Sequence, residues 1–356
     1  MRTALTAVLD GCHWQADLCR RNGSPTYVAL IEEIVARLGH DEALTDLLTA
    51  DGQDPVRSAL CLRLFGAVNR LAMAAEAPWL GKLYPTFGGS VDTDRAVQEF
   101  LAFAGARWDD VAVEMRTGVQ TNEVGRAAPL SAAMNHVAAV TGHPLRLLEV
   151  GASAGLNLWL DRYGYAAGGR TWGRADSPLQ LVDHFESGDV PTAGFTVVER
   201  RGCDLEPLDV HSPGTATLLR SFVWPEHEER RARLDAALEV AQQQPGVPIV
   251  AADATAWVEQ HTADLPAGVT TVLFHSIVMP YLSRDDRAAF GDAVRRAGAR
   301  AAGDRPLAWI SLEPSDSDSG VVLLTCETWP GGDRRQLAVT TPHGLQVRWD
   351  PREVDA

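Results

Sequence analysis

One stretch of the chain contains residues whose types and spacing could do chemistry in two different ways. Residues 147–160 read LLEVGASAGLNLWL. The string Gly151-x-Ser153-x-Gly155 matches the sharp turn that raises a nucleophilic serine above a sheet. The same stretch also has an acidic residue, Glu149, followed by small residues and glycines. This pattern binds nucleotide-type cofactors through the backbone. Ser153 is therefore either a nucleophile or a backbone position beside a bound cofactor.

The nucleophile interpretation requires a serine esterase with several strands before its serine and an oxyanion-hole loop upstream. The residues before the stretch show no strand-like alternation, and their only Gly-Gly pair, Gly88-Gly89, has no histidine directly before it. His275 or His343, with Asp253, could supply the remaining members of a triad. The missing strands favour the cofactor interpretation, and the esterase stays as an alternative.

The first part of the chain has the pattern of helices. Residues 27–38 have apolar residues on one face, as in an amphipathic helix, and residues 55–73 are apolar on most sides, as in a buried helix. A third helix is predicted at 92–105, where Asp92 is a plausible N-cap. We therefore expect an all-helical domain over residues 1–143.

The pattern changes in residues 144–356. Short apolar runs at 145–150, 195–200, 247–252, 270–282 and 306–315 read as strands, and most alternate with helices. The first run predicts a strand–loop–helix unit. Two further strand segments, at 321–330 and 345–350, predict an antiparallel hairpin at the C-terminus. We expect an α/β domain with a mostly parallel sheet, interrupted by an insertion at about 164–194.

Acidic or polar residues follow the strands where ligands of open α/β sheets bind: Asp204 after the second, Asp253 after the third and His275 after the fourth. This sequential pattern resembles the class I S-adenosylmethionine-dependent methyltransferases, with their Rossmann-like sheet. The resemblance implies S-adenosylmethionine as cofactor. It assigns the ribose hydroxyls to Asp204, or less well to Glu199, and the remaining cofactor contacts to Glu149, Gly151, Ala152, Ser153, Gly155, Asn157, Asp253 and Ala254.

The chain departs from the methyltransferase pattern at two points. Ser153 stands where the middle glycine of the loop is usual, so a side chain occupies space in which backbone approaches the cofactor. Asp204 lies 53 residues after Gly151 (204 − 151), whereas about 20 residues is the usual separation in the analogous dinucleotide sites. The insertion at about 164–194 must therefore loop out of the sheet.

The whole chain also resembles a narrower group, the bacterial domain-of-unknown-function family numbered twenty-three thirty-two. The strings QTNEVGRAAPL, LLEVGASAGLNL, RRGCDLEPLDV and VLFHSIVMPYL carry this resemblance over nearly the full length. It implies no reaction.

The resemblance to methyltransferases gives His275 the position of a base facing the transferred methyl group; a purely structural hydrogen bond at a strand end is the alternative. Four hydrogen-bonding side chains occur within seven residues before the helix predicted at 130–141. A helix-capping loop accounts for one or two of them, and the others suggest contacts to a substrate or cofactor from the N-terminal domain. The expected substrate-binding residues are Gln120, Asn122, Glu123, Arg126, Tyr84 and Tyr281.

Composition narrows the class of protein. The formal net charge of −15 disfavours a nucleic-acid surface, which needs clustered Lys and Arg. No apolar run approaches the length of about 20 residues that spans a bilayer. The five cysteines are scattered, and no cluster has the spacing of a metal site. We expect a cytoplasmic protein without a metal or a membrane partner, and no signal in the sequence sets an oligomeric state.

These observations lead to one principal hypothesis and two alternatives. The principal hypothesis is an S-adenosylmethionine-dependent methyltransferase that modifies an oxygen or nitrogen of a small molecule, with residues 1–143 as a lid over residues 144–356. The first alternative is a catalytically degenerate module that binds a cofactor or a partner. The second is the serine esterase with Ser153.

Overall fold

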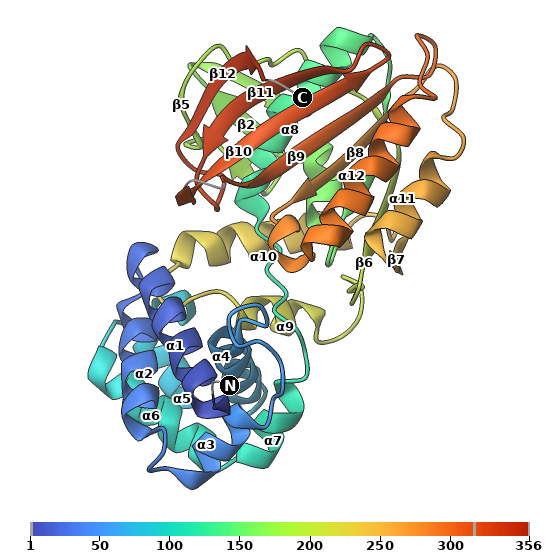
Figure 1. The fold of residues 1–356 in the computed structure, drawn as a ribbon. Coiled ribbons are helices and arrows are strands. Elements are labelled where there is room, and N and C mark those ends of the chain that lie inside the picture. Colours follow the sequence, from blue (N-terminus) through green and yellow to red (C-terminus); the bar gives the residue numbers. More distant parts are fainter. Residues whose placement is uncertain (1–2, 316–317, 355–356) are drawn as a thin grey trace. The chain divides into compact units, whose positions relative to one another are not determined.

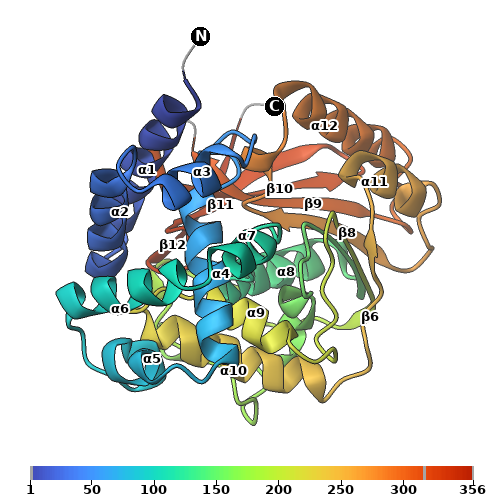
Figure 2. The same ribbon diagram turned by 90° about the horizontal axis from the view of Figure 1, so that it is seen from below.

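The computed structural model describes residues 3–315 and 318–354. The chain divides into two compact units, which we call the helical unit (residues 1–121 and 213–232) and the sheet unit (residues 122–212 and 233–356). Both are drawn in Figures 1 and 2. The coarse expectation of a mixed α/β protein with a large, mostly parallel sheet and a helical N-terminal region is confirmed. The lid role assigned to residues 1–143 stays a prediction.

The helical unit contains no strand among its described residues. Asp92 caps α6 as expected, because its Oδ1 accepts the N–H of Arg95 at 3.2 Å. The helix predicted from residue 55 begins later, at Leu60, since Ala59 has a left-handed φ of 48° that no helix can continue through. The elements of the unit are α1 (Ala4–Arg21), α2 (Pro25–Arg37), α3 (Glu42–Thr49), α4 (Leu60–Ala74), α5 (Pro78–Leu83), η1 (Pro85–Phe87), α6 (Thr93–Gly105), α7 (Trp108–Glu114) and α9 (Thr215–Ser221).

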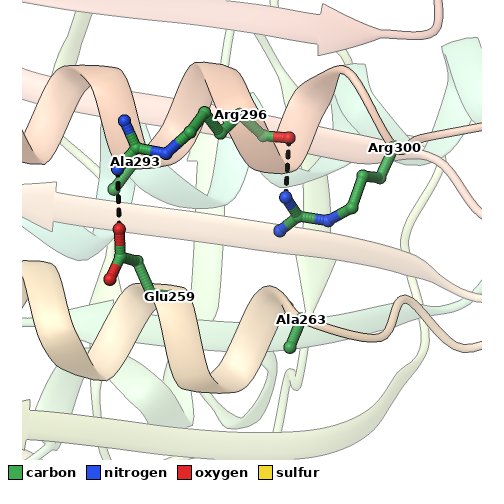
Figure 3. A pocket seen from close by; sticks show the side chains of 5 residues that line it. All are labelled: Glu259, Ala263, Ala293, Arg296 and Arg300. Atoms are coloured by element: carbon green, nitrogen blue, oxygen red, sulfur yellow. Dashed lines mark hydrogen bonds and ion pairs between the residues drawn. The ribbon is translucent and has the colours of Figure 1, made fainter.

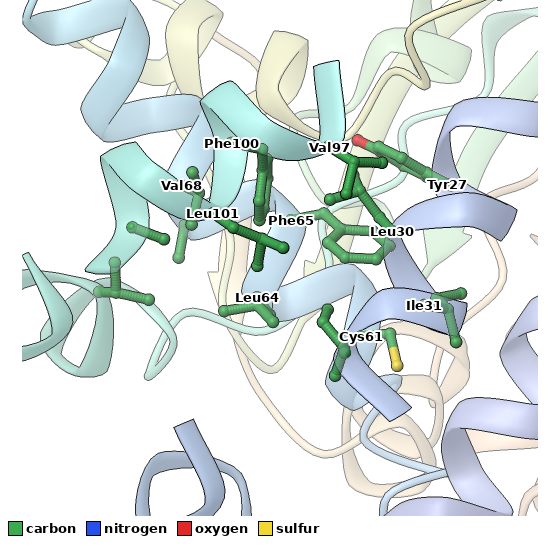
Figure 4. Close-up of a cluster of buried hydrophobic side chains, with 14 of the residues drawn as sticks. Tyr27, Leu30, Ile31, Cys61, Leu64, Phe65, Val68, Val97, Phe100 and Leu101 are labelled. Atoms are coloured by element: carbon green, nitrogen blue, oxygen red, sulfur yellow. The ribbon is translucent and has the colours of Figure 1, made fainter. Parts of the chain in front are cut away.

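Aromatic rings from three helices form the core of the helical unit (Figure 4). Phe65 of α4 packs against Tyr27 of α2, with ring centroids 4.4 Å apart, and edge-on against Phe100 of α6 at 5.7 Å. Asn69, one turn further along α4, donates a hydrogen bond from Nδ2 to the Tyr27 hydroxyl at 3.0 Å. The buried ring of Tyr27 thus keeps a partner for its polar end.

The sheet unit carries the remaining elements. Its helices are η2 (Val124–Arg126), α8 (Ala127–Thr141), η3 (Leu156–Arg162), most of α10 (Glu228–Gln242), α11 (Ala254–Thr262), η4 (Met279–Tyr281) and α12 (Arg284–Gly298). Its strands are β1 (Leu145–Val150), β2 (Gly164–Ala167), β3 (Arg170–Gly173), β4 (Gln180–Leu181), β5 (Phe185–Ser187), β6 (Val197–Asp204), β7 (Ile249–Ala251), β8 (Thr270–Ser276), β9 (Leu307–Ser315), β10 (Asp318–Trp329), β11 (Asp333–Thr340) and β12 (Val347–Glu353).

The strand order creates a topological switch point. Within the described ranges the large sheet runs β5-β12-β11-β10-β9-β8-β1-β6-β7, and β7, β6, β1, β8 and β9 are mutually parallel. The chain moves from β1 outward to β6 and β7, and then returns to the other side of β1 as β8. The carboxyl ends of these strands form one border of the sheet, which we call the carboxyl edge. Ligands of open α/β sheets bind at such an edge, beside the switch point.

Two expectations about the order of elements are wrong in detail. An α-helix does not follow the loop after β1; the seven-residue 3-10 helix η3 does, and the small sheet β3-β2-β4 comes next. The C-terminal strands form the antiparallel series β9-β10-β11-β12 rather than one hairpin. The strand β11 was missed because it begins with the charged residues Asp333, Arg334 and Arg335. The predicted insertion at 164–194 contains β2, β3, β4 and β5.

Helices cover both faces of the sheet. Helices α11 and α12 lie on one face, where Leu148, Val150 and Leu273 form a core with Trp257 and Phe290 (Figure 1). Helix α8 packs on the other face, against β9 and β10 (Figures 1 and 2). We call these the α12 face and the α8 face. None of the helices in the described part of the chain is long and apolar enough to cross a bilayer.

We expect Phe65→Ala to lower the free energy of unfolding of the protein by about 3–5 kcal/mol, because it leaves a cavity between Tyr27 and Phe100. Phe103→Ala is the matched control, since Phe103 is only half-buried beside this core and its removal should cost clearly less. Urea unfolding of both variants checks the difference. Equal losses for the two would contradict the central place given to Phe65.

Candidate functional site

The loop that follows β1 is built on three residues with left-handed backbone. Gly151, Ser153 and Gly155 have φ values of 70°, 51° and 70°. Glycine adopts this conformation without strain, whereas Ser153 holds it at some cost. The loop folds back over β6, because the N–H groups of Gly151 and Ala152 both donate to the carbonyl oxygen of Cys203, at 2.9 and 3.0 Å. The glycines in the sequence pattern are thus explained by backbone geometry.

Asp204, the last residue of β6, holds the loop in place. Its Oδ2 accepts the N–H of Ser153 at 2.8 Å, and its Oδ1 accepts the N–H of Glu206 at 2.9 Å. The carbonyl oxygen of Ser153 in turn accepts the N–H of Leu208 at 3.1 Å. The structure therefore brings Ser153 and Asp204 together although they are 51 positions apart in the sequence.

Glu149 lies beneath the loop and is almost completely buried, at 2% exposure. Strand register places Glu149, Asp204 and Ser276 on the same face, the α8 face, since Glu149 is opposite Gly202 of β6 and Phe274 of β8. Burial raises the pKa of Glu149 well above its ordinary value, and the nearby charge of Asp204 raises it further.

Two neighbours act on Glu149 in the opposite direction. A side-chain hydrogen bond with Asn157 and the positive charge of Arg126 both lower its pKa, without cancelling the effect of burial. The Oε2 atom of Glu149 and the Oδ1 atom of Asn157 are buried without a hydrogen-bond partner. The site thus contains acceptor oxygens that a donor group of a ligand could satisfy.

The segment Asn122–Arg126 reaches the same site. Asn122 donates from Nδ2 to the carbonyl oxygen of Ala152 at 3.1 Å, and Arg126 donates from Nη1 to the carbonyl oxygen of Ser276 at 3.0 Å. Glu123 is buried and pairs with Nδ1 of His343 at 3.0 Å. Three of the residues predicted to bind substrate therefore touch the loop, the end of β8 or the turn before β12.

The other predicted residues are placed differently. Tyr84 belongs to the core of the helical unit and contacts Trp79 edge-on at 5.3 Å, and the buried Gln120 also belongs to that unit. Tyr281 in η4 is exposed, at 63%. Asp253 is exposed and caps α11, with its Oδ1 accepting the N–H of Ala256 at 3.0 Å, and Ala254 is the first residue of that helix.

His275 lies on the α12 face, opposite to Glu149 and Ser276, and it is fully buried. Its Nδ1 lies 2.6 Å from Oε1 of Glu313, and its Nε2 accepts the indole N–H of Trp309 at 3.1 Å. Its ring also contacts Phe290 edge-on at 5.5 Å. Both ring nitrogens therefore have protein partners, and neither is directed to a ligand. This geometry argues for the structural alternative.

Sequence reasoning missed Glu313, which links β9 to the turn after β8. Its carboxylate also accepts the N–H groups of Val278 and Met279, at 2.9 and 3.2 Å. The available signal was a carboxylate near the end of the otherwise apolar run PLAWISLEPS.

A shallow groove of about 350 Å³ lies between α11 and α12, away from these residues (Figure 3). It is lined by Glu259, Ala263, Ala293, Arg296 and Arg300. Arg296 pairs with Glu259 at 2.6 Å, and Arg300 donates to the carbonyl oxygens of Arg296 and Thr262. Both guanidinium groups are engaged, so the groove does not resemble an anion site. The described residues contain no group of three or more His, Cys, Asp or Glu side chains arranged for a metal ion.

The raised pKa of Glu149 predicts a pH dependence of stability. The folded state binds more protons than the unfolded chain at pH values between the ordinary pKa and the raised one, so stability falls as pH rises through that window. Glu149→Gln mimics the protonated acid and should remove this loss, by about 1.4 kcal/mol for each unit of pKa shift.

The measurement is urea unfolding of Glu149→Gln and of the wild type from about pH 5 to about pH 9. Glu206→Gln, which removes an exposed carboxylate close to the same loop, is the matched control for the loss of one charge. If the free energy of unfolding changed with pH in the same way for Glu149→Gln and the wild type, the prediction would be contradicted.

Comparison with protein families places the chain in one of them. The family described as "Uncharacterized protein conserved in bacteria (DUF2332)" matches residues 10–349. No curated protein and no solved structure matches the chain. Because the family match spans nearly the whole chain, the protein belongs to this bacterial family, DUF2332.

Proposed function

We propose that the protein is an S-adenosylmethionine-dependent methyltransferase that acts on an oxygen or nitrogen of a small molecule. The observation that carries this proposal is the bond between Asp204 and Ser153. It joins a glycine-containing loop to an acidic residue at the switch point of a parallel sheet, on the same face as the buried Glu149. Open α/β sheets bind their ligands at that place.

The charge of the site favours this cofactor over a dinucleotide. The carboxylates of Asp204 and Asp253 repel a pyrophosphate, whereas a cation beside the buried Glu149 favours its charged form. The loop leads into the short 3-10 helix η3 and not into an α-helix, so the strong N-terminal dipole that binds phosphates is missing there. A ligand with hydroxyl groups and positive charge is the better match, and S-adenosylmethionine has both.

The unpartnered oxygens support the same ligand class. Oε2 of Glu149 and Oδ1 of both Asn157 and Asn122 are buried without donors. An ammonium group offers such donors. Asp204 still has acceptor capacity beyond its two backbone bonds and would bind the ribose hydroxyls, while the exposed Asp253 lies at the end of the next strand.

When bound, S-adenosylmethionine supplies an electrophilic methyl group, and the chain must mainly hold the nucleophile in line with it. His275 stays a candidate base from sequence, but its bonds to Glu313 and Trp309 leave it no free nitrogen. We therefore propose that residues at the carboxyl edge orient the substrate, with Asn122 and Arg126 as candidates. A module that binds the cofactor without turnover is the alternative that the environment of His275 favours.

One observation favours the esterase: Ser153 has a left-handed φ of 51°, and the nucleophile of a G-x-S-x-G turn is also strained. Two observations oppose it. Ser153 follows the first strand of its sheet along the chain, and the histidines proposed for a triad bond to Glu313 and Glu123. The esterase therefore ranks below the methyltransferase.

Calorimetric titration with S-adenosylmethionine tests the proposal. We expect micromolar binding by the wild type and a loss of at least about tenfold in affinity for Asp204→Asn and for Asp253→Asn. Asp253→Asn keeps the cap of α11, because Asn caps helices as well as Asp, and Asp204→Asn keeps one of the two acceptor oxygens that bind backbone N–H groups.

The exposed Asp264, just after α11, provides the control Asp264→Asn, which should bind as the wild type does. Absence of binding by the wild type would refute the cofactor assignment.

The variant Ser153→Gly separates the methyltransferase from the esterase. Glycine relieves the left-handed strain but adds flexibility to the unfolded chain, so we expect stability to change by less than about 1 kcal/mol. Affinity for S-adenosylmethionine should be retained. Ser153→Ala, which keeps the strain and removes the hydroxyl, is the control. Labelling of the wild type by a serine-reactive phosphonate, lost in both variants, would instead establish Ser153 as a nucleophile.

A further inference from the structure

The carboxylate of Glu313 gathers donors from the turn after β8. Its Oε1 accepts the N–H of Val278 at 2.9 Å and lies 2.6 Å from Nδ1 of His275, and its Oε2 accepts the N–H of Met279 at 3.2 Å. Only 13% of its side chain is exposed. Since Trp309 donates to Nε2 of His275, the ring carries its proton on Nδ1 and donates it to Glu313.

The turn held by Glu313 is strained. Ile277 has a φ of 54°, which is an outlier for a β-branched residue. Its own N–H donates to the carbonyl oxygen of Leu312 at 2.9 Å, and the next two N–H groups go to Glu313. A strained backbone persists only where its surroundings fix it. Here β9 supplies that constraint, through its main chain and through one carboxylate.

The turn after β8 packs directly against the loop after β1. A Cβ atom built on Gly151 would lie 2.4 Å from Cγ2 of Val278, so the Val278 side chain occupies the space beside that glycine. Gly151 is also the residue whose N–H donates to Cys203, two positions before the Ser153–Asp204 bond. The position of Val278 therefore limits where the loop can go.

We propose that Glu313 is a positioning residue for the loop Gly151–Gly155. It fixes the turn after β8, and Val278 transmits that constraint to Gly151. The effect on the loop concerns the protein without ligand and is independent of the reaction. The effect on ligand affinity rests on the proposed function.

Hydrogen–deuterium exchange of the ligand-free protein tests the first part. In Glu313→Gln one acceptor oxygen becomes an NH₂ group that faces other donors. We expect amides in residues 145–160 and 270–283 to exchange at least about tenfold faster than in the wild type. The urea concentration at the midpoint of unfolding should change little. Glu327→Gln is the matched control, because Glu327 is a half-buried carboxylate on the adjacent strand β10. Faster exchange in 270–283 alone would overturn the proposal.

Val278→Ala separates the two steps and serves if Glu313→Gln does not fold. It leaves the bonds to Glu313 intact and removes the methyl groups beside Gly151. We expect faster exchange in 145–160 with 270–283 unchanged. Unchanged exchange in 145–160 would overturn the proposal.

Titration with S-adenosylmethionine then tests the consequence for the ligand. We expect the dissociation constant to rise about tenfold in both Glu313→Gln and Val278→Ala. If the wild type does not bind, the proposed function fails, while the exchange data still decide the role of Glu313. Binding by the wild type and equal binding by both variants would overturn the positioning role for the ligand.

Discussion

The carboxyl edge of the sheet depends on the carboxylate of Asp204. Its two oxygens accept N–H groups from Ser153 and Glu206, and its carbonyl oxygen accepts the N–H of Ala252 after β7. One residue thus joins the ends of β1, β6 and β7. Because Ser153 is in a strained conformation, the bond from Asp204 also stabilises the loop shape that the strain opposes.

The electrostatics of this edge follow from the same arrangement. Glu149 and Asp204 lie on one face of the sheet, and burial and mutual repulsion make the charge on Glu149 unfavourable. Arg126 offsets part of that repulsion, but its guanidinium is also bonded to the carbonyl oxygens of Pro342 and Ser276. A positively charged donor that bonds to Oε2 of Glu149 would offset the free-energy cost of burying its charge. This is the physical basis for the ligand class proposed here.

Strand alternation decides the roles of two adjacent residues. Ser276 points to the α8 face, where it meets Arg126, whereas His275 points to the α12 face, where Glu313, Trp309 and Phe290 enclose it. A shift of one residue would exchange the two side chains. The histidine that stood out as a base is instead part of the support for the turn after β8.

The sequence by itself determined the local elements. Apolar spacing located α2, α4 and β1, Asp92 marked the start of α6, and the glycines marked the turn after β1. These features depend on neighbours along the chain, so the pattern contains them. The charged beginning of β11 and the 3-10 form of η3 were missed, because tertiary pairing and packing override local preference there.

Only the tertiary structure decided how the candidate site is assembled. The Ser153–Asp204 bond closes across 51 residues, and the Glu313–Val278 bond across 35. The face on which each strand-end side chain lies was equally undetermined, since period-two alternation shows which residues share a face but not which face each strand turns to the site. Long-range hydrogen bonds and the choice of face arise when the sheet packs, and no local pattern in the chain encodes them.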